Sequence, residues 1–429
     1  MYFRVQADSR GQGVGQKKTK DKSKKTKVKR QKELHNMEMI SFEQAYDTVI
    51  NSGSKTGTEV IPFTGSLNRI LASDVFSDVD LPPFNKATVD GFACRRPELG
   101  NDLEIIETIA AGQWPVKPVE KMQCSRIMTG APVPAGADCV IMVEETEILP
   151  SGKVRFKGSY KKENIAVKGE DVKKGDIVLT AGRKIRPQEI AVMASVGHVS
   201  VTVSKMPEVA VISSGSELVE PSEVPGISQI RNSNSSQLLA QVAMAGATGN
   251  YYGIAPDDVD QTYLIINKAI SENDIILITG GVSMGDFDFV PSVLERAGVK
   301  ILFTRIAVQP GKPTTFGMHP GAAVFGLPGN PVASYIMFEL LVRPLISKMM
   351  DYNWQPLKIK LPMSEKFSRS FADRMAFIPV IITDNGFVSP VEYHGSAHIS
   401  AIPEAYGIVT VPIGKQTLEK GEIVSVRQI

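Results

Sequence analysis

The sequence predicts a multidomain protein of the α/β plus β class. A doubly wound α/β domain is expected to follow an inserted, mostly β domain and to precede a small C-terminal β domain. The length of 429 residues suits about three domains. Strand-like and helix-like runs alternate along 207–349, whereas 58–170 and 350–429 hold short β-like runs between Pro and Gly turns.

The α/β domain is predicted from its alternating runs. Strands are expected at EVAVIS, near Tyr251–Ile254, and at DIILITGG, KILFTRIAV and AAVFGL. Helices are expected at SQLLAQVAMAG, DDVDQTYLIINKAI, PSVLERAG and SYIMFELLVRPLISKMM. This alternation favours a parallel sheet that is covered by helices.

Two helices are predicted outside that region. Ser41 and Gln44 form a capping box before an apolar-periodic run. A second helix is expected over 187–196, with Pro187 in its first turn and Gly197 at its end. We expect these helices to pair, so that 37–57 and 171–206 form one discontinuous N-terminal domain that holds the insertion 58–170.

The charge is distributed unevenly along the chain. Residues 1–34 hold 12 Lys or Arg and 3 Asp or Glu, and the rest is mildly acidic. We expect 1–36 to be a basic disordered tail or a segment before a true start at Met37, with an arm that contacts a polyanion as the alternative. The acidic body gives no support for nucleic-acid binding.

The three cysteines form no metal-binding or disulfide pattern, which fits a reducing compartment. No run is long and apolar enough for a membrane span, and the start has no secretory signal. A cytoplasmic location is therefore expected. His394 and His398 lack partners at metal-ligand spacing, and no nucleophile elbow of a hydrolase occurs.

Polar loops follow three of the predicted strands: SSGSEL, GGVSMGDFD and LPGNP. In an open parallel sheet these loops share the carboxyl edge, where ligands bind. Glycines let backbone N–H groups approach a phosphate, and carboxylates beside a phosphate imply Mg²⁺. The candidate carboxylates are Glu217, Asp257, Asp286 and Asp288, although Asp286 also suits a helix cap.

Three further segments are rich in Gly and polar residues. PPFNKATVDGFACR contains Asp90 and Gly91, RIMTGAPVPAGAD contains Thr129 and Gly130, and NIAVKGED contains Lys168, Glu170 and Asp171. A hairpin turn is the simplest interpretation of Asp90-Gly91, and an exposed turn suits Lys168–Asp171. Spacing alone leaves their function open.

Together these segments resemble the MoeA family of molybdopterin molybdenumtransferases, which includes the gephyrin E domain. The matching stretches cover 37–429 in the family's order: PPFNKATVDGFA, RIMTGAPVPAGAD, NIAVKGED, VAVISSGSEL, ILITGGVSMGDFDFV, VQPGKPTTFG and FGLPGNPVASY. The resemblance implies four domains, one of them a pterin-nucleotide-binding α/β domain, in an elongated homodimer. It implies transfer of molybdate to adenylylated molybdopterin with release of AMP, assisted by Mg²⁺.

The resemblance also implies site residues and their roles. The catalytic residues would be Asp90, Thr129, Asp171 and Glu217, and the metal ligands Glu217 and Asp288. In the family's dimer, Asp90 and Thr129 of one subunit meet Glu217 and Asp288 of the other. The substrate-binding residues would be Ser214, Gly215, Asp257, Gly280, Gly281, Ser283, Gly285, Arg305, Lys312, Pro328, Gly329, Asn330, Arg374 and Ser396.

Two positions depart from the family pattern. Gln309 stands where several members have lysine, and Ala166 where others often have arginine. Arg305, Lys312 and Lys168 would supply the remaining positive charge. Weaker binding of molybdate, or a shift toward tungstate, stays open.

Two other functions stay open at this point. One is a gephyrin-like binding scaffold without catalysis, and the other is a pterin-nucleotide hydrolase or adenylyltransferase. The partners implied by the resemblance are adenylylated molybdopterin, molybdate, a second copy of the chain and the upstream molybdopterin adenylyltransferase.

Overall fold

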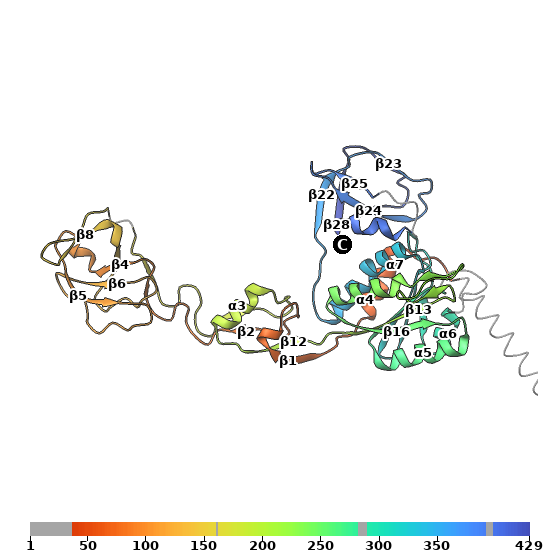
Figure 1. Cartoon of the computed structure of the whole chain (residues 1–429), viewed down its shortest axis with the longest axis horizontal. Coiled ribbons are helices and arrows are strands. Elements are labelled where there is room, and N and C mark those ends of the chain that lie inside the picture. Colours follow the sequence, from red (N-terminus) through yellow and green to blue (C-terminus); the bar gives the residue numbers. More distant parts are fainter. Residues whose placement is uncertain (1–36, 160–161, 282–289, 392–397) are drawn as a thin grey trace, which may run out of the picture. The chain divides into compact units, whose positions relative to one another are not determined.

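The structure is a computed structural model that describes residues 37–159, 162–281, 290–391 and 398–429. The chain forms two compact units (Figure 1). The main unit combines the residues up to Thr58 with Ser204–Ile429, and the inserted unit is Glu59–Val203. The basic segment 1–36 lies outside the described residues. No described helix has both the length and the apolar character that crossing a bilayer requires.

The main unit contains a six-stranded sheet with the order β16-β13-β17-β21-β20-β18. The first four strands in this order are parallel and the last two run antiparallel to their neighbours. Every residue of β17 and β21 is buried, as expected for central strands covered on both faces. The strands are β13 (Glu208–Ser214), β16 (Thr248–Ala255), β17 (Ile275–Thr279), β18 (Lys300–Phe303), β20 (Thr315–His319) and β21 (Ala322–Leu327).

Helices cover both faces of this sheet, which confirms the doubly wound arrangement. Figure 1 shows α4 and α7 on one face and α5 and α6 on the other. Asn232 caps α4, and Asp258 caps α5 by accepting from the N–H groups of Asp260 and Gln261. The helices are α4 (Ser233–Ala245), α5 (Val259–Glu272), α6 (Val290–Arg296), α7 (Pro331–Met337), the π-helical η4 (Phe338–Val342) and α8 (Arg343–Met349).

The expectation of a parallel sheet was wrong for one strand, β20, which was not predicted and runs antiparallel to both β21 and β18. β20 and β21 form a hairpin around Pro320 and Gly321, and Gly321 has φ +95°. A Pro-Gly pair between two strands is a turn signal that the expected helix–strand alternation obscured. The run KILFTRIAV is also divided: β18 ends at Phe303, and β19 (Val308–Gln309) joins a different sheet.

The C-terminal part is built on a second six-stranded sheet, which agrees with the predicted small β domain. Its order is β19-β24-β26-β28-β22, and β25 pairs with β24. Its core includes Ile378, Val409 and Val426. Its strands after β19 are β22 (Lys358–Pro362), β24 (Met375–Ile382), β25 (Val388–Pro390), β26 (Gly407–Val411) and β28 (Ile423–Gln428); β23 (Phe367–Ser368) and β27 (Thr417–Leu418) pair separately.

The described residues of the inserted unit form three hydrophobic clusters. Two of them involve the four-stranded sheet β5-β6-β4-β7, in which β5 and β6 are parallel and the other neighbours antiparallel. The other includes Leu71, Val75, Met193 and Val203, so it draws on both ends of this unit.

The elements around the four-stranded sheet are β4 (Gly91–Cys94), β5 (Glu104–Ile109), β6 (Gln123–Ile127), β7 (Cys139–Met142), β8 (Thr146–Ile148), β9 (Val154–Phe156) and the pair β3 (Lys86–Ala87) with β10 (Ile165–Ala166). Those of the other core are β1 (Thr58–Pro62), β2 (Val75–Phe76), β11 (Ile177–Leu179), α3 (Pro187–Ser195) and β12 (Ser200–Ser204).

The two predicted N-terminal helices exist, and each packs within a different unit, while their pairing stays a prediction. α2 (Phe42–Ser52) has the capping box of Ser41 and Gln44 and packs against η4 and α8 in the main unit. α3 begins with Pro187 and packs against β11 in the inserted unit. An apolar stripe shows that a helix needs a partner, but it does not identify that partner. The division into four domains stays a prediction.

We predict that Gly91→Ala destabilises the inserted unit. A Cβ at this position would lie 1.8 Å from the carbonyl oxygen of Ile141 on β7, which is far inside van der Waals contact. We expect a loss of at least about 2 kcal/mol in the free energy of unfolding, measured by denaturant titration. Gly100→Ala is the control, since no atom lies within 4 Å of its Cβ position. Equal stability of the two variants would contradict this packing.

Candidate functional site

The carboxyl ends of three adjacent parallel strands bring their loops together in the main unit. β17 lies between β13 and β21, so the loops that begin at Ser214, Gly280 and Pro328 are neighbours. Gly280 N–H donates to the carbonyl of Leu327 at 3.3 Å. The convergence predicted from the sequence is therefore confirmed as geometry, while the roles of these residues stay a prediction.

The loop after β17 approaches its neighbours so closely that it admits only glycine. Gly280 has φ +83°, and a Cβ there would lie 2.2 Å from the carbonyl oxygen of Ser214. Gly281 has φ +64°, and its Cβ would lie 2.7 Å from Val290 Cγ2. Gly329 lies beside Gly280, and its Cβ position is at an ordinary van der Waals distance of 3.6 Å from Gly280 Cα. The edge is therefore lined by bare backbone, which suits a phosphate.

Hydroxyl and amide groups support this edge from behind. Ser213 Oγ donates to Asn232 Oδ1 at 2.9 Å, and Thr279 Oγ1 donates to Ser213 Oγ at 3.3 Å. Asn234 Nδ2 donates to the carbonyl of Gly329 at 2.7 Å, which ties the start of α4 to the loop after β21. Ser214 Oγ is buried and has no hydrogen-bond partner among the described residues.

Sequence reasoning missed Asn232 and Asn234. The signal was present in RNSNSS, where Asn232 is an N-cap ahead of an apolar run. A capping role accounts for Asn232 without involving a site. Only the structure shows that Asn234 reaches the neighbouring loop.

Two of the predicted carboxylates lie at one end of this edge. Asp257 Oδ2 accepts from the N–H of Ser216 at 3.1 Å. The carboxylate of Glu217 folds back over Gly215, whose Cβ would lie 2.3 Å from Glu217 Oε2. Glu217 and Asp257 are both exposed. Their carboxylate oxygens are the kind of ligand that Mg²⁺ prefers, so these two side chains fit a Mg²⁺ ion.

The described residues contain no group of three or more side chains poised to hold a metal. Asp286 and Asp288, and the predicted substrate residues Ser283 and Gly285, lie outside the described residues. Of the two predicted metal ligands, only Glu217 is described, and the Mg²⁺ site stays a prediction.

The predicted cationic residues come from two segments that pair in the second sheet. β19 lies parallel to β24, with Gln309 opposite Ala376, and Met375 N–H donates to the carbonyl of Ala307 at 2.9 Å. This pairing brings the segment from Arg305 to Lys312 beside Arg374. Arg305 donates to the carbonyl of Met37, and Lys312 is exposed. Ser396, predicted for the same site, lies outside the described residues.

The inserted unit holds a second polar centre, formed by Asp90 and Thr129. Asp90 Oδ1 accepts from both the backbone N–H and the Oγ1 hydroxyl of Thr129, each at 2.7 Å. These hydrogen bonds, the backbone one first, lower the pKa of Asp90 below its ordinary value, with a smaller contribution from Arg126. Asp90 is therefore a carboxylate at neutral pH.

The hairpin-turn interpretation of Asp90-Gly91 was wrong. Asp90 immediately precedes β4, and Gly91 is the first residue of that strand, paired with both Ile127 and Met142. Glycine is needed at position 91 because β7 approaches the Cα atom closely. The φ angle of Gly91 is not positive, so no left-handed turn requires glycine there. In a sequence, an Asp-Gly pair is compatible with a tight turn and also with a strand whose neighbour approaches it closely.

The three motifs of the inserted unit lie side by side. β3 pairs with β10, and Gly130 N–H donates to the carbonyl of Ala87 at 2.8 Å. Lys168 N–H donates to Asn85 Oδ1 at 2.8 Å. The turn that ends at Asp171 is therefore tied to the segment that leads to Asp90.

Asp171 itself is exposed, and its N–H donates to the carbonyl of Leu81 at 3.0 Å. Lys168, expected to compensate for Ala166, forms an ion pair with Asp80 at 3.4 Å. Its charge is therefore partly neutralised within the chain.

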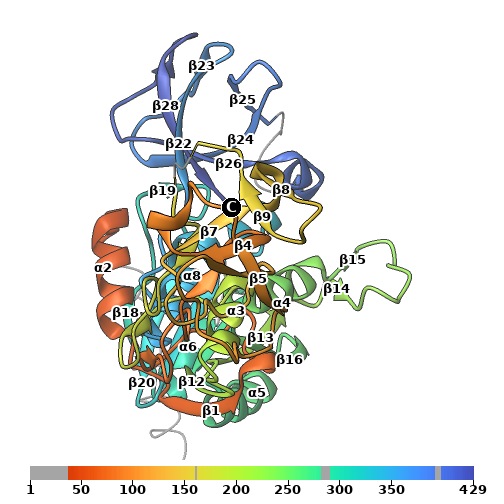
Figure 2. The ribbon, with the colours of Figure 1, turned by 90° about the vertical axis from the view of Figure 1, so that its left-hand side faces the viewer.

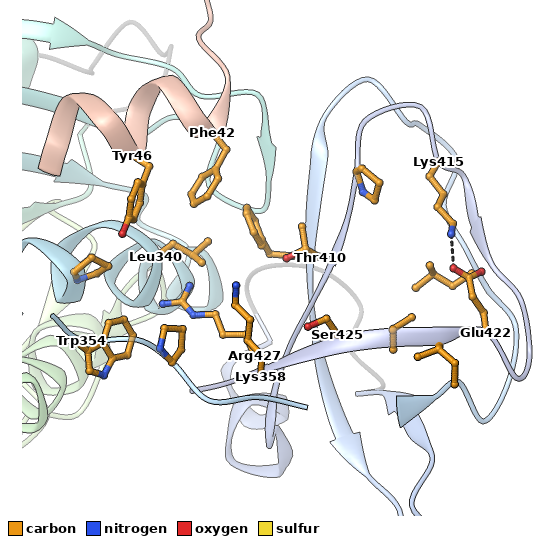
Figure 3. Close-up of a pocket in the computed structure, with 17 residues that line it drawn as sticks. Phe42, Tyr46, Leu340, Trp354, Lys358, Thr410, Lys415, Glu422, Ser425 and Arg427 are labelled. Atoms are coloured by element: carbon orange, nitrogen blue, oxygen red, sulfur yellow. Dashed lines mark hydrogen bonds and ion pairs between the residues drawn. The ribbon is translucent and has the colours of Figure 1, made fainter. Parts of the chain in front are cut away.

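A separate cavity of about 570 Å³ lies in the main unit between α2, η4 and the second sheet (Figure 3). Its lining includes Tyr46, Trp354 and Phe377 together with Lys358 and Arg427. Burial lowers the pKa of Arg427, whose guanidinium lies 5.5 Å from the centre of the Trp354 ring. None of the predicted site residues lines this cavity.

Comparison with known proteins accounts for nearly the whole chain. Family models match at 40–197 (MoeA N-terminal region, domain I and II), 210–348 (probable molybdopterin binding domain) and 360–429 (MoeA C-terminal region, domain IV). The molybdopterin molybdenumtransferase of Staphylococcus epidermidis is 36% identical over 398 residues, covering 90% of this chain and 95% of that protein. That of Staphylococcus aureus is 34% identical over 397 residues, with the same coverage.

Solved structures agree with these matches. The molybdopterin biosynthesis moeA protein of Pyrococcus horikoshii is 32% identical in one structure, with a TM-score of 0.77 over 91% of this chain and 99% of that one. A second structure is 29% identical, with a TM-score of 0.79 over 91% of this chain and 100% of that one. An α/β domain between β-rich N-terminal and C-terminal regions defines the class of protein. The chain belongs to the MoeA family of molybdopterin molybdenumtransferases.

We predict that removing the Thr129 hydroxyl changes the pH dependence of the reaction proposed below. Thr129→Val removes one of two hydrogen bonds to Asp90, so the pKa of Asp90 rises toward its ordinary value. If the ionised carboxylate is the active form, the acid limb of the kcat/KM profile moves to higher pH. Thr129→Ser keeps the hydroxyl and should leave the limb in place. An acid limb that does not move in Thr129→Val would show that Asp90 ionisation does not control the rate.

Proposed function

We propose that this chain inserts molybdate into adenylylated molybdopterin, with release of AMP and formation of the molybdenum cofactor. The observation that carries the proposal is the convergence of the loops after β13, β17 and β21 at one sheet edge. That edge offers bare backbone, an unpartnered buried hydroxyl and adjacent carboxylates. A phosphorylated nucleotide that requires a divalent cation fits this chemistry.

The nucleotide's phosphates are assigned to the loops of the main sheet. Gly280, Gly281 and Gly329 carry no side chains of their own, so we propose that phosphate oxygens approach their backbone N–H groups. Ser214 Oγ is free to donate to a phosphate or hydroxyl oxygen. Gly215, Asp257, Pro328 and Asn330 complete the set that we propose contacts the nucleotide.

The cationic residues are assigned to the molybdate oxyanion. Arg305, Lys312 and Arg374 lie on neighbouring segments of the second sheet. Positive charge there offsets the repulsion between molybdate and the phosphates of the other substrate. Gln309 lowers that charge relative to relatives with lysine, so we expect weaker binding of molybdate or a greater tolerance of tungstate.

Glu217, with Asp288, would hold Mg²⁺ as proposed from the family pattern. When bound, the ion would screen the phosphates and stabilise charge that develops at phosphorus. The chain's own contribution is to position these carboxylates next to the glycine-lined loops, as the fold of Glu217 over Gly215 illustrates.

Asp90 and Thr129 are proposed to serve the same reaction, together with Asp171. Since Asp90 is ionised at neutral pH, it is able to accept a proton from water or to orient an incoming oxygen atom. The Thr129 hydrogen bonds hold its carboxylate in one orientation. Both roles require the charged form.

We also propose a homodimer that meets the upstream molybdopterin adenylyltransferase, because its adenylylated product is the substrate assigned here. The described cysteines Cys94, Cys124 and Cys139 are free thiols, which is consistent with a reducing cytoplasm.

The proposal predicts AMP release that depends on molybdate. Purified protein would be incubated with adenylylated molybdopterin and Mg²⁺, with and without molybdate, while AMP and pterin-bound molybdenum are measured. We expect AMP and bound molybdenum to rise together, and Asp90→Ala and Glu217→Ala each to lose most of this turnover. AMP without bound molybdenum would indicate a pterin-nucleotide hydrolase. No AMP would indicate a binding scaffold, and either result would contradict the proposal.

A further inference from the structure

One aromatic residue of the inserted unit, Trp114, is unusually exposed. Trp114 is 71% exposed, although tryptophan is normally well buried. Its ring meets that of Phe84 edge to face, with the ring centres 5.8 Å apart and the planes at 88°. Phe84 supports one side of the indole, and the rest of the ring stays accessible.

The loop that carries Trp114 is fixed by its own hydrogen bonds. Gln113 N–H donates to the carbonyl of Ala110 at 3.0 Å, and Gln113 Oε1 accepts from the N–H of Ala110 at 3.2 Å. Beyond Trp114, the N–H groups of Val116 and Lys117 donate to the carboxylate of Glu107 at 3.3 and 3.2 Å. An exposed ring on a fixed loop loses little conformational entropy when it binds a partner.

This loop lies at the edge of the sheet that carries Asp90 and Thr129. β5 and β6 are parallel neighbours, so Ala110–Trp114 and Met128–Gly130 leave the sheet at the same edge. Met128 N–H donates to the carbonyl of Ile109 at 3.0 Å, and the Cβ position of Gly130 lies 3.9 Å from Ala111 Cβ.

Phe84 reaches the same edge from a different segment. It precedes Asn85, whose carbonyl accepts from Val133 N–H at 2.8 Å in the loop after Thr129. The segments that carry the two rings therefore both lie next to the loop that contains Thr129.

We propose that Trp114, supported by Phe84, stacks on a flat heteroaromatic ring of the substrate and so helps to determine specificity. This inference rests on the function proposed above, whose substrate carries two such rings, an adenine and a pterin. Polar groups at Asp90 and Thr129 would meet the charged part of the substrate, while the indole offers a π-face of matching size. We expect this contact to be equally strong in the ground state and the transition state, so that its loss raises KM and leaves kcat unchanged.

The main test separates KM from kcat in the molybdate-dependent assay. Trp114→Ala should raise KM for adenylylated molybdopterin about tenfold with kcat within about twofold. Trp114→Phe keeps a ring and should restore most of the affinity. Val116→Ala is the matched control, since it truncates an 85% exposed apolar residue of the same loop and should behave as the unmodified protein does.

A second measurement identifies the ring. The chain has two tryptophans, so Trp354→Phe leaves Trp114 as the sole indole fluorophore. Saturable quenching by AMP would assign the contact to adenine, and no response to AMP together with a raised KM in Trp114→Ala would assign it to the pterin.

An unchanged KM in Trp114→Ala would overturn the inference, and so would a loss of dimer mass in that variant, because the ring would then be an interface residue. If the unmodified protein shows no molybdate-dependent AMP release, the proposed function fails instead. In that case quenching by AMP would still support the ring contact, and its absence would reject it.

Discussion

The backbone contact between Gly280 and Ser214 sets the geometry of the whole sheet edge. Two adjacent parallel strands end there, and the carbonyl of Ser214 lies where any side chain on residue 280 would have to stand. The positive φ of Gly280 turns the chain sharply back toward the loop after β21. Gly281 and Gly329 lie next to this contact, and the Ser214 hydroxyl there has no partner among the described residues.

The inserted unit builds its polar centre by a related principle. Parallel β5 and β6 deliver Trp114 and Thr129 to one edge, and antiparallel β4 begins there with Asp90 next to it. The two donors of Thr129 then keep that carboxylate ionised and oriented. Figure 2 presents the ribbon from a second direction and labels β4, β5 and β7 of the four-stranded sheet. Each unit therefore concentrates its chemistry where strands begin or end.

Local signals made much of this predictable. The capping box at Ser41, Pro187 in the first turn of α3 and the polar loops after β13, β17 and β21 could all be located from short stretches of sequence. Each depends on residues a few positions apart, or on the rule that parallel strands share a carboxyl edge.

Features that depend on distant pairing were not predictable in the same way. The partner of α2, the antiparallel direction of β20 and the departure of β19 into another sheet arise from contacts across long stretches of chain. The reach of Asn234 to Gly329 and the strand position of Gly91 belong to the same group. A sequence pattern states that such a residue is polar or small, but not which neighbour it meets.

Hydrogen–deuterium exchange of the full chain with adenylylated molybdopterin and Mg²⁺ tests the central claim most directly. The account predicts slower exchange on binding in 213–218, 279–281 and 327–331, where the loops of adjacent parallel strands converge. The lining of the separate cavity, including Thr410 and Ser425, serves as an internal comparison and should exchange at an unchanged rate. Protection confined to that cavity, with none at the sheet edge, would contradict the assignment of the nucleotide to these loops.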